Sequence, residues 1–322
     1  AMGQDIRYSD EKLEAAWNYI NKIWNISRFI GIKFAENNYQ GEEINLELLN
    51  AVDRWILKRL NETIAQVDEY YDKYEFGEVA KTLYKYVWNE FASWYLEMTK
   101  IVFGEKEEAE KINTCAVLNY CLTAILKLLH PFMPFVTEEI YQKYQDGSIV
   151  ISSWPKIKDI YEFADASNIE VIYEIITAVR NLRAIKNVPN SKELNVELQI
   201  RDLELMNFVN DNLRFLKRFI NYNQIEISQN EVDTKGKNIT VLSTVTIAIP
   251  LAELVDIQEE IEKLKQNHLK MLAEIKRCQG LLNNPGFMSK APQDKIEAEK
   301  EKLKNYQEQL LEIEKLLKEY SA

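Results

Sequence analysis

The sequence contains few glycines, prolines, cysteines and histidines: 9 Gly, 7 Pro, 3 Cys and 2 His among 322 residues. Glycine and proline form tight turns and interrupt helices, so their scarcity predicts long helices and few turns. The cysteines form no CxxC pair, which leaves too few ligands for a zinc site and suits a reducing cytoplasm. No run approaches about 18 uncharged apolar residues, so we expect no membrane contact.

The usual signatures of catalysis are also missing. The sequence has no glycine-rich phosphate loop, no cluster of metal ligands, and no serine or cysteine nucleophile with a histidine nearby. The carboxylate pair Glu138-Glu139 is predicted to be helical, where neighbouring side chains point apart and face solvent. We therefore predict no catalytic residue, no metal site and no cofactor bound by this chain.

Basic charge is in deficit, since 40 Lys and Arg stand against 51 Asp and Glu and the net charge is −11. This balance argues against non-specific nucleic-acid binding but leaves room for a local basic patch. Residues 172–222 hold eight Lys/Arg against six Asp/Glu, a small local reversal to +2.

Residues 1–145 are predicted to form an antiparallel helical bundle, because apolar residues recur every three or four positions. Ser9 is a candidate N-cap of the first helix. The prolines of HPFMPF, residues 130–135, should break the helical run. The predicted helices span about 10–38, 45–73, 76–103, 107–129 and 136–145.

Residues 146–250 are predicted to form a small α/β linker domain. The segment 194–200 alternates apolar and polar residues with period two, as a half-buried strand does. Further strands are expected at 224–228 and 239–249, and helices at about 168–187 and 202–220.

Residues 251–322 show a heptad pattern in two stretches, from Leu254 to Leu282 and from Ile296 to Tyr320, with Glu299 as the one polar intrusion. The loop NNPGFMSKAP, residues 283–292, separates them. An intermolecular coiled coil is one interpretation, but the loop favours an antiparallel coiled-coil hairpin within one chain. Arms of about 30 residues would extend roughly 45 Å.

The first helix has an unusual face. At 100° per residue, Leu13, Trp17 and Trp24 fall within about 60° of Ile20, which predicts the buried side. Asn18, Lys22, Asn25 and Phe29 fall on the opposite side. Phe29 either packs on another helix or forms a stacking platform with amide and ammonium donors around it, as recognition of unstacked RNA bases requires.

Several segments together closely resemble the part of valyl-tRNA synthetases that follows the catalytic domain, over essentially residues 3–322. The terminal heptad hairpin favours resemblance to the valine enzymes over the related isoleucine enzymes, because the isoleucine enzymes tend to end in a cysteine zinc module. The segments are GQDIRYS (3–9), NKIWNISRF (21–29), DRWIL (53–57), YEFG (74–77), WYLE (94–97), LLHPFMPFVTEE (128–139), VRNLR (179–183) and NVP (187–189).

The resemblance implies an anticodon-binding bundle, a linker domain and a tRNA-binding arm. It also implies a fragment that lacks the catalytic and editing domains, is inactive alone, and depends on a partner domain that uses ATP and Mg²⁺. The implied partner is tRNA(Val), bound by a cytoplasmic monomer. The family's anticodon contacts map onto Arg7, Lys22, Asn25, Arg28 and Phe29, and charge near the arm tip suggests Lys270, Lys276, Arg277, Lys290 and Lys295.

Met288-Ser289-Lys290 spells the centre of the KMSKS loop with which this family binds ATP. Phe287 and Ala291 replace the first lysine and last serine of that motif, and heptads flank it on both sides. We therefore interpret it as a turn. Two alternatives to the valine assignment stay open: a coiled-coil scaffold that binds proteins, and the matching part of an isoleucyl- or leucyl-type synthetase.

Overall fold

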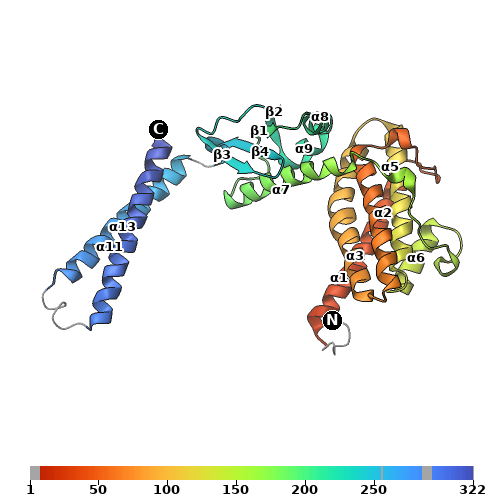
Figure 1. Ribbon diagram of the computed structural model, residues 1–322, viewed down its shortest axis with the longest axis horizontal. Coiled ribbons are helices and arrows are strands. Elements are labelled where there is room, and N and C mark those ends of the chain that lie inside the picture. Colours follow the sequence, from red (N-terminus) through yellow and green to blue (C-terminus); the bar gives the residue numbers. More distant parts are fainter. Residues whose placement is uncertain (1–7, 255–256, 285–291, 322) are drawn as a thin grey trace. The chain divides into compact units, whose positions relative to one another are not determined.

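The computed structural model describes residues 8–254, 257–284 and 292–321, and Figure 1 labels their helices and strands. The chain divides into two compact units. The first comprises Ala1–Thr177 and Ile200–Ile220, and the second comprises Ala178–Gln199 and Asn221–Ala322. The three-domain division at residues 145 and 250 stays a prediction.

The first unit is an antiparallel helical bundle, as predicted. Its helices are α1 (Asp10–Glu36), η1 (Leu46–Leu48), α2 (Ala51–Asp72), α3 (Phe76–Tyr84), η2 (Lys85–Tyr95), α4 (Leu96–Gly104), α5 (Glu108–Leu129), α6 (Pro134–Tyr144), η3 (Ile149–Ile151), η4 (Asp159–Tyr161), η5 (Ala166–Asn168), the start of α7 (Ile169–Ile185), α8 (Leu203–Asp211) and α9 (Leu213–Ile220).

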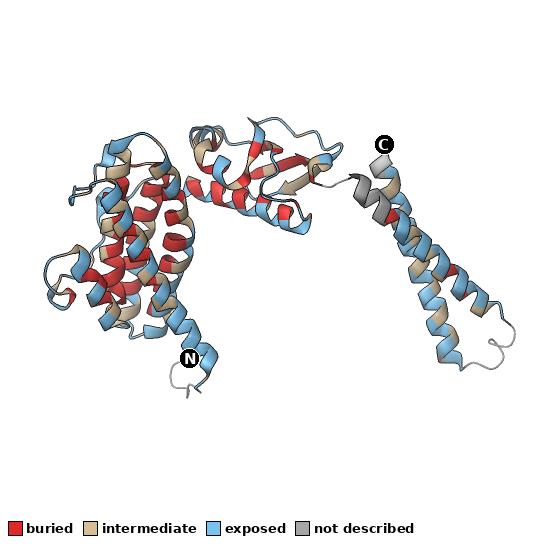
Figure 2. Ribbon diagram, turned by 180° about the vertical axis from the view of Figure 1, so that it is seen from behind, coloured by how far each residue is buried: buried red, intermediate tan, exposed pale blue. Residues whose placement is uncertain are grey.

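Helix α1 begins where the sequence predicts, with the Ser9 hydroxyl accepting a hydrogen bond from the backbone N–H of Lys12. Its predicted buried side is wrong. Leu13 and Trp17 are 55% and 62% exposed, while the buried residues are Ile23, Ile26, Ser27 and Ile30. Helix α1 packs against α5 and α6, its buried residues all lie in its second half, and Figure 2 shows its first turns exposed.

The core of the bundle is centred on α2, where Ile56, Leu57, Leu60 and Ile64 are fully buried. The predicted helix 76–103 is continuous, but its middle, η2, is a π-helix that the sequence pattern does not reveal. The helix predicted from residue 45 instead begins at Ala51, because the Asn50 side chain caps it.

Helix α5 is long and apolar enough to span a membrane by length and composition. It is a core helix of the bundle, however, since 72% of its apolar window is buried. Its two cysteines, Cys115 and Cys121, are buried free thiols, in line with the sequence interpretation.

The second unit contains a mixed four-stranded sheet in the order β2-β1-β4-β3. The strands are β1 (Leu194–Ile200), β2 (Tyr222–Ser228), β3 (Lys237–Val241) and β4 (Val245–Pro250). β1 and β2 are parallel, so their connection needs a crossover, which runs through α8 and α9. The single strand predicted at 239–249 is instead the antiparallel hairpin β3–β4.

The second unit also contains α10 (Leu251–Leu254) and a hairpin of two long helices, α11 (Ile257–Leu282) and α13 (Gln293–Ser321), which confirms the predicted coiled coil. Leu264, Ile275 and Cys278 are buried along the seam. Glu299, the polar intrusion, accepts hydrogen bonds from the Cys278 thiol and, at 2.9 Å, from Lys302. The bond from Lys302 lowers the pKa of Glu299, so the seam holds a carboxylate.

Gly31 of α1 is a position where a side chain has no room. A Cβ there would lie 2.6 Å from the hydroxyl oxygen of Tyr144, which donates a hydrogen bond to the Ser27 carbonyl. Gly77 of α3 has no atom within 4 Å of its ideal Cβ position.

We expect Gly31→Ala to lower the free energy of unfolding by about 1–3 kcal/mol, because Tyr144 must move. Gly77→Ala should instead raise it by up to about 1 kcal/mol, as alanine in a helix normally does. Chemical denaturation of both variants measures the difference. Equal stabilisation by the two alanines would show that the Tyr144 contact imposes no constraint.

Asp53 of α2 is a buried carboxyl group that joins three helices. Its Oδ1 accepts a hydrogen bond of 2.7 Å from the Tyr95 hydroxyl of η2, and its Oδ2 accepts one of 3.3 Å from the Thr114 hydroxyl of α5. Burial raises the pKa of Asp53 from 3.8 to about 7, although the hydrogen bond from Tyr95 opposes the shift.

The folded state therefore binds the Asp53 proton more tightly than the unfolded state, so the stability that this carboxyl contributes falls as pH rises from about 4 to 7. The Asp53→Asn variant has no carboxyl group to titrate at this position. The difference between its melting temperature and that of the unsubstituted protein should therefore increase as pH rises from about 4 to 7. Thermal unfolding of both proteins at several pH values measures the difference. Parallel curves would contradict the shifted pKa.

Candidate nucleic-acid interface

The residues predicted on the first helix that the structure describes lie within two turns of α1. Lys22 and Phe29 are half-buried, while Asn25 and Arg28 are exposed. Arg7 lies outside the described residues. We call Lys22, Asn25, Arg28 and Phe29 the α1 strip. Because seven residues of helix rise about 10 Å, Lys22 and Phe29 mark two separate contact points rather than one.

The first contact point places a cation over an aromatic stack. The ammonium group of Lys22 lies 5.3 Å from the centroid of the Trp88 ring of η2. The Trp88 ring stacks on Tyr84 of α3, with centroids 5.5 Å apart and planes at 11°. Tyr19 of α1 completes the cluster, 5.3 Å from Tyr84. Tyr84 is 45% exposed, so the stack reaches solvent.

The second contact point surrounds Phe29. Lys33 of α1 and Lys100 of α4 place their ammonium groups 5.7 Å and 5.9 Å from the centroid of its ring. Each lysine also forms an ion pair of 2.6 Å, with Glu36 and Glu97 respectively. Phe29 is half-buried and its ring faces Lys100 of another helix, so both the packing and the stacking interpretation of Phe29 stay predictions.

Between these points, Asn25 and Arg28 present free donors. Among the described residues, neither side chain has a hydrogen-bond or ion-pair partner. An aromatic stack, a half-exposed ring and unpaired amide and guanidinium donors are the groups that hold unstacked bases and their phosphates. The arrangement contains no acid–base pair or nucleophile, and the described residues hold no group of metal ligands.

Sequence reasoning missed Tyr84, Trp88 and Lys100. Tyr84 and Trp88 are four residues apart in a helical run, which places them on one face and is a usable signal. Their position beside Lys22 depends on tertiary packing and on the π-helical turn of η2, which has no signature in the sequence.

The predicted arm residues are on the surface of the hairpin but differ in how they are paired. Lys270, Lys276 and Lys295 are exposed. Arg277 is bound by Glu274 at 2.8 Å and lies 3.8 Å from Glu299. Lys290 lies outside the described residues. Of the predicted arm residues that the structure describes, three lysines thus have exposed ammonium groups, while the arginine is held by carboxylates.

Comparison with known proteins finds two families in chain order. The family model described as the anticodon-binding domain of tRNA ligase matches residues 53–198, and that of the valyl tRNA synthetase tRNA-binding arm matches residues 256–320. This chain belongs to the valyl-tRNA synthetase family. The α1 strip precedes the first match, and all the predicted arm residues fall inside the second.

Similar curated proteins include the valine–tRNA ligases of Enterococcus faecalis, Streptococcus mutans and Listeria monocytogenes, which are 42%, 41% and 42% identical to this chain. These matches cover 94–99% of the chain. The chain spans only 35–38% of the length of these relatives.

Proposed function

We propose that this chain is the tRNA-recognition part of a valyl-tRNA synthetase and that it binds tRNA(Val). The bundle would read anticodon bases with the α1 strip and the Tyr84–Trp88 stack. The hairpin of α11 and α13 would hold the outer corner of the tRNA. Bound in this way, as a cytoplasmic monomer, the tRNA would present its acceptor end to a catalytic domain that uses ATP and Mg²⁺.

One observation carries the proposal: an anticodon-binding match and a valine-specific arm match follow one another in a single chain. The geometry of the α1 strip supports it, because half-exposed rings flanked by cations suit single-stranded bases. A protein-binding scaffold has no comparable support, and an isoleucyl- or leucyl-type synthetase is disfavoured by the identity of the arm.

Binding of purified tRNAs tests the proposal directly. We expect tRNA(Val) to bind more tightly than tRNA(Ile), and a changed anticodon to weaken tRNA(Val) by about tenfold or more, since a lost base stack costs about 1–3 kcal/mol. Affinity should fall steeply with salt, because lysine–phosphate contacts release counterions. Equal, feeble binding of every tRNA would overturn the proposal.

The α1 strip makes a sharper prediction. Phe29→Ala and Trp88→Ala should each weaken tRNA(Val) binding by about 1–3 kcal/mol through loss of a stacking surface. Phe132→Ala is the matched control, since Phe132 is 40% exposed but lies in the turn before α6. Fluorescence anisotropy measures affinity and thermal unfolding measures stability.

If Phe29→Ala lowers the melting temperature but leaves tRNA affinity at the level of Phe132→Ala, Phe29 is a packing residue. The same comparison applies separately to Trp88, so the two contact points can be judged one at a time.

A further inference from the structure

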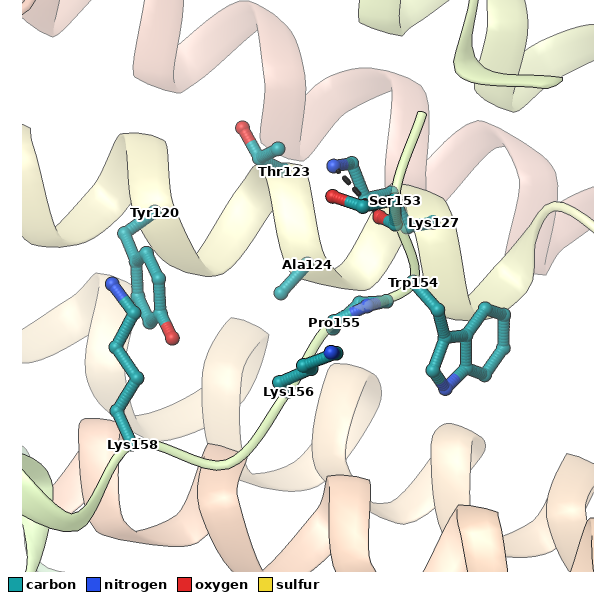
Figure 3. A pocket seen from close by; sticks show the side chains of 9 residues that line it. All are labelled: Tyr120, Thr123, Ala124, Lys127, Ser153, Trp154, Pro155, Lys156 and Lys158. Atoms are coloured by element: carbon teal, nitrogen blue, oxygen red, sulfur yellow. Dashed lines mark hydrogen bonds between the residues drawn. The ribbon is translucent and has the colours of Figure 1, made fainter. Parts of the chain in front are cut away.

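A cavity of about 400 Å³ lies in the first unit, away from the α1 strip. One wall is α5, which contributes Tyr120, Ala124 and Lys127. The other is the segment 153–158, which contributes Lys156 and Lys158 (Figure 3). The lining includes three lysines and no carboxylate, in a chain whose acidic residues outnumber its basic ones.

The three ammonium groups lack anionic partners. Lys127 donates a hydrogen bond of 3.1 Å to the Ser153 carbonyl, and burial lowers the pKa of Lys127. Lys158 lies 4.5 Å from the centroid of the Tyr120 ring. Among the side chains that the structure describes, none of the three lysines forms an ion pair. Their positive charge is therefore not neutralised by a neighbouring carboxylate, so a bound anion would lower the electrostatic energy of the site.

The wall formed by residues 153–158 is fixed at both ends by α2. The Trp154 indole N–H donates to Asp68 at 2.8 Å. At the other end, the Asn61 amide donates to the Lys158 carbonyl at 2.8 Å and accepts from the Lys158 N–H at 3.1 Å. Asn61 is buried, so this clamp is shielded from water. A preformed wall reduces the ordering cost of binding a ligand.

We propose that this cavity binds a phosphate-bearing anion up to the size of a mononucleotide. The lysines would hold phosphate oxygens through charge-assisted hydrogen bonds, and the apolar floor at Ala124 and Pro155 would accept the rest of the molecule. Two sources carry this chemistry: a free nucleotide, or a phosphate of bound RNA. Neither depends on the anticodon contacts proposed above.

Calorimetric titration with ADP, pyrophosphate and adenosine, at low salt and without Mg²⁺, tests the cavity. We expect ADP and pyrophosphate to bind with one site per chain, and adenosine, which lacks phosphate, to bind far more weakly. Lys127→Met and Lys156→Gln should each reduce ADP affinity roughly tenfold or more, the effect of one lost charge-assisted hydrogen bond. Lys156 is exposed, so its substitution should leave folding intact.

Lys106→Gln is the matched control: this exposed lysine lies outside the cavity and should leave ADP affinity unchanged. Absence of binding by both ADP and pyrophosphate would overturn the proposal. Equal weakening by Lys106→Gln would also overturn it, because it would show a diffuse charge effect. Competition between tRNA and ADP then distinguishes the two sources. If tRNA displaces ADP, the cavity binds a phosphate of RNA. If saturating tRNA leaves ADP binding unchanged, the cavity binds a free nucleotide.

Discussion

The buried carboxyl group of Asp53 is the interaction on which the bundle depends. From α2 it accepts hydrogen bonds from η2, through Tyr95, and from α5, through Thr114. These bonds hold η2 against α2 and α5. Trp88 lies seven residues before Tyr95 in the same π-helix, and its ring centroid is 5.3 Å from the ammonium group of Lys22 of α1. A polar group in the core of the bundle thus holds the helix that carries part of the aromatic surface at its edge.

The net charge of this molecule does not describe its surface, because some charged side chains are paired and others are not. Some surface lysines form short ion pairs within one helix turn, such as Lys73 with Glu69 and Lys81 with Glu78. Such exposed pairs add little stability, but they neutralise the surface locally. Among the described residues, Lys22 and Arg28 of the α1 strip and the three lysines of the cavity beside α5 form no ion pair. An acidic protein can therefore bind polyanions at chosen sites while repelling them elsewhere.

The sequence was a good guide wherever structure follows local periodicity. The bundle helices, strand β1 and the hairpin of α11 and α13 all repeat a burial pattern that the chain alone displays. Prediction from the sequence failed where contacts with other elements determine the structure. Helical periodicity placed Trp17 inside, but its side chain is 62% exposed. The π-helix and the split of residues 239–249 into two strands are likewise set by tertiary packing and backbone hydrogen bonds.

The candidate site shows the same division in more detail. Lys22, Asn25 and Phe29 could be placed together because one helix carries them, and the helical repeat determines which way each points. Trp88 and Lys100 come from other helices, so no local pattern connects them with that face. Yet these two residues provide the stack under Lys22 and one of the cations beside Phe29. When a candidate recognition surface is built from several helices, the sequence pattern therefore reveals only the residues that lie together on one helix.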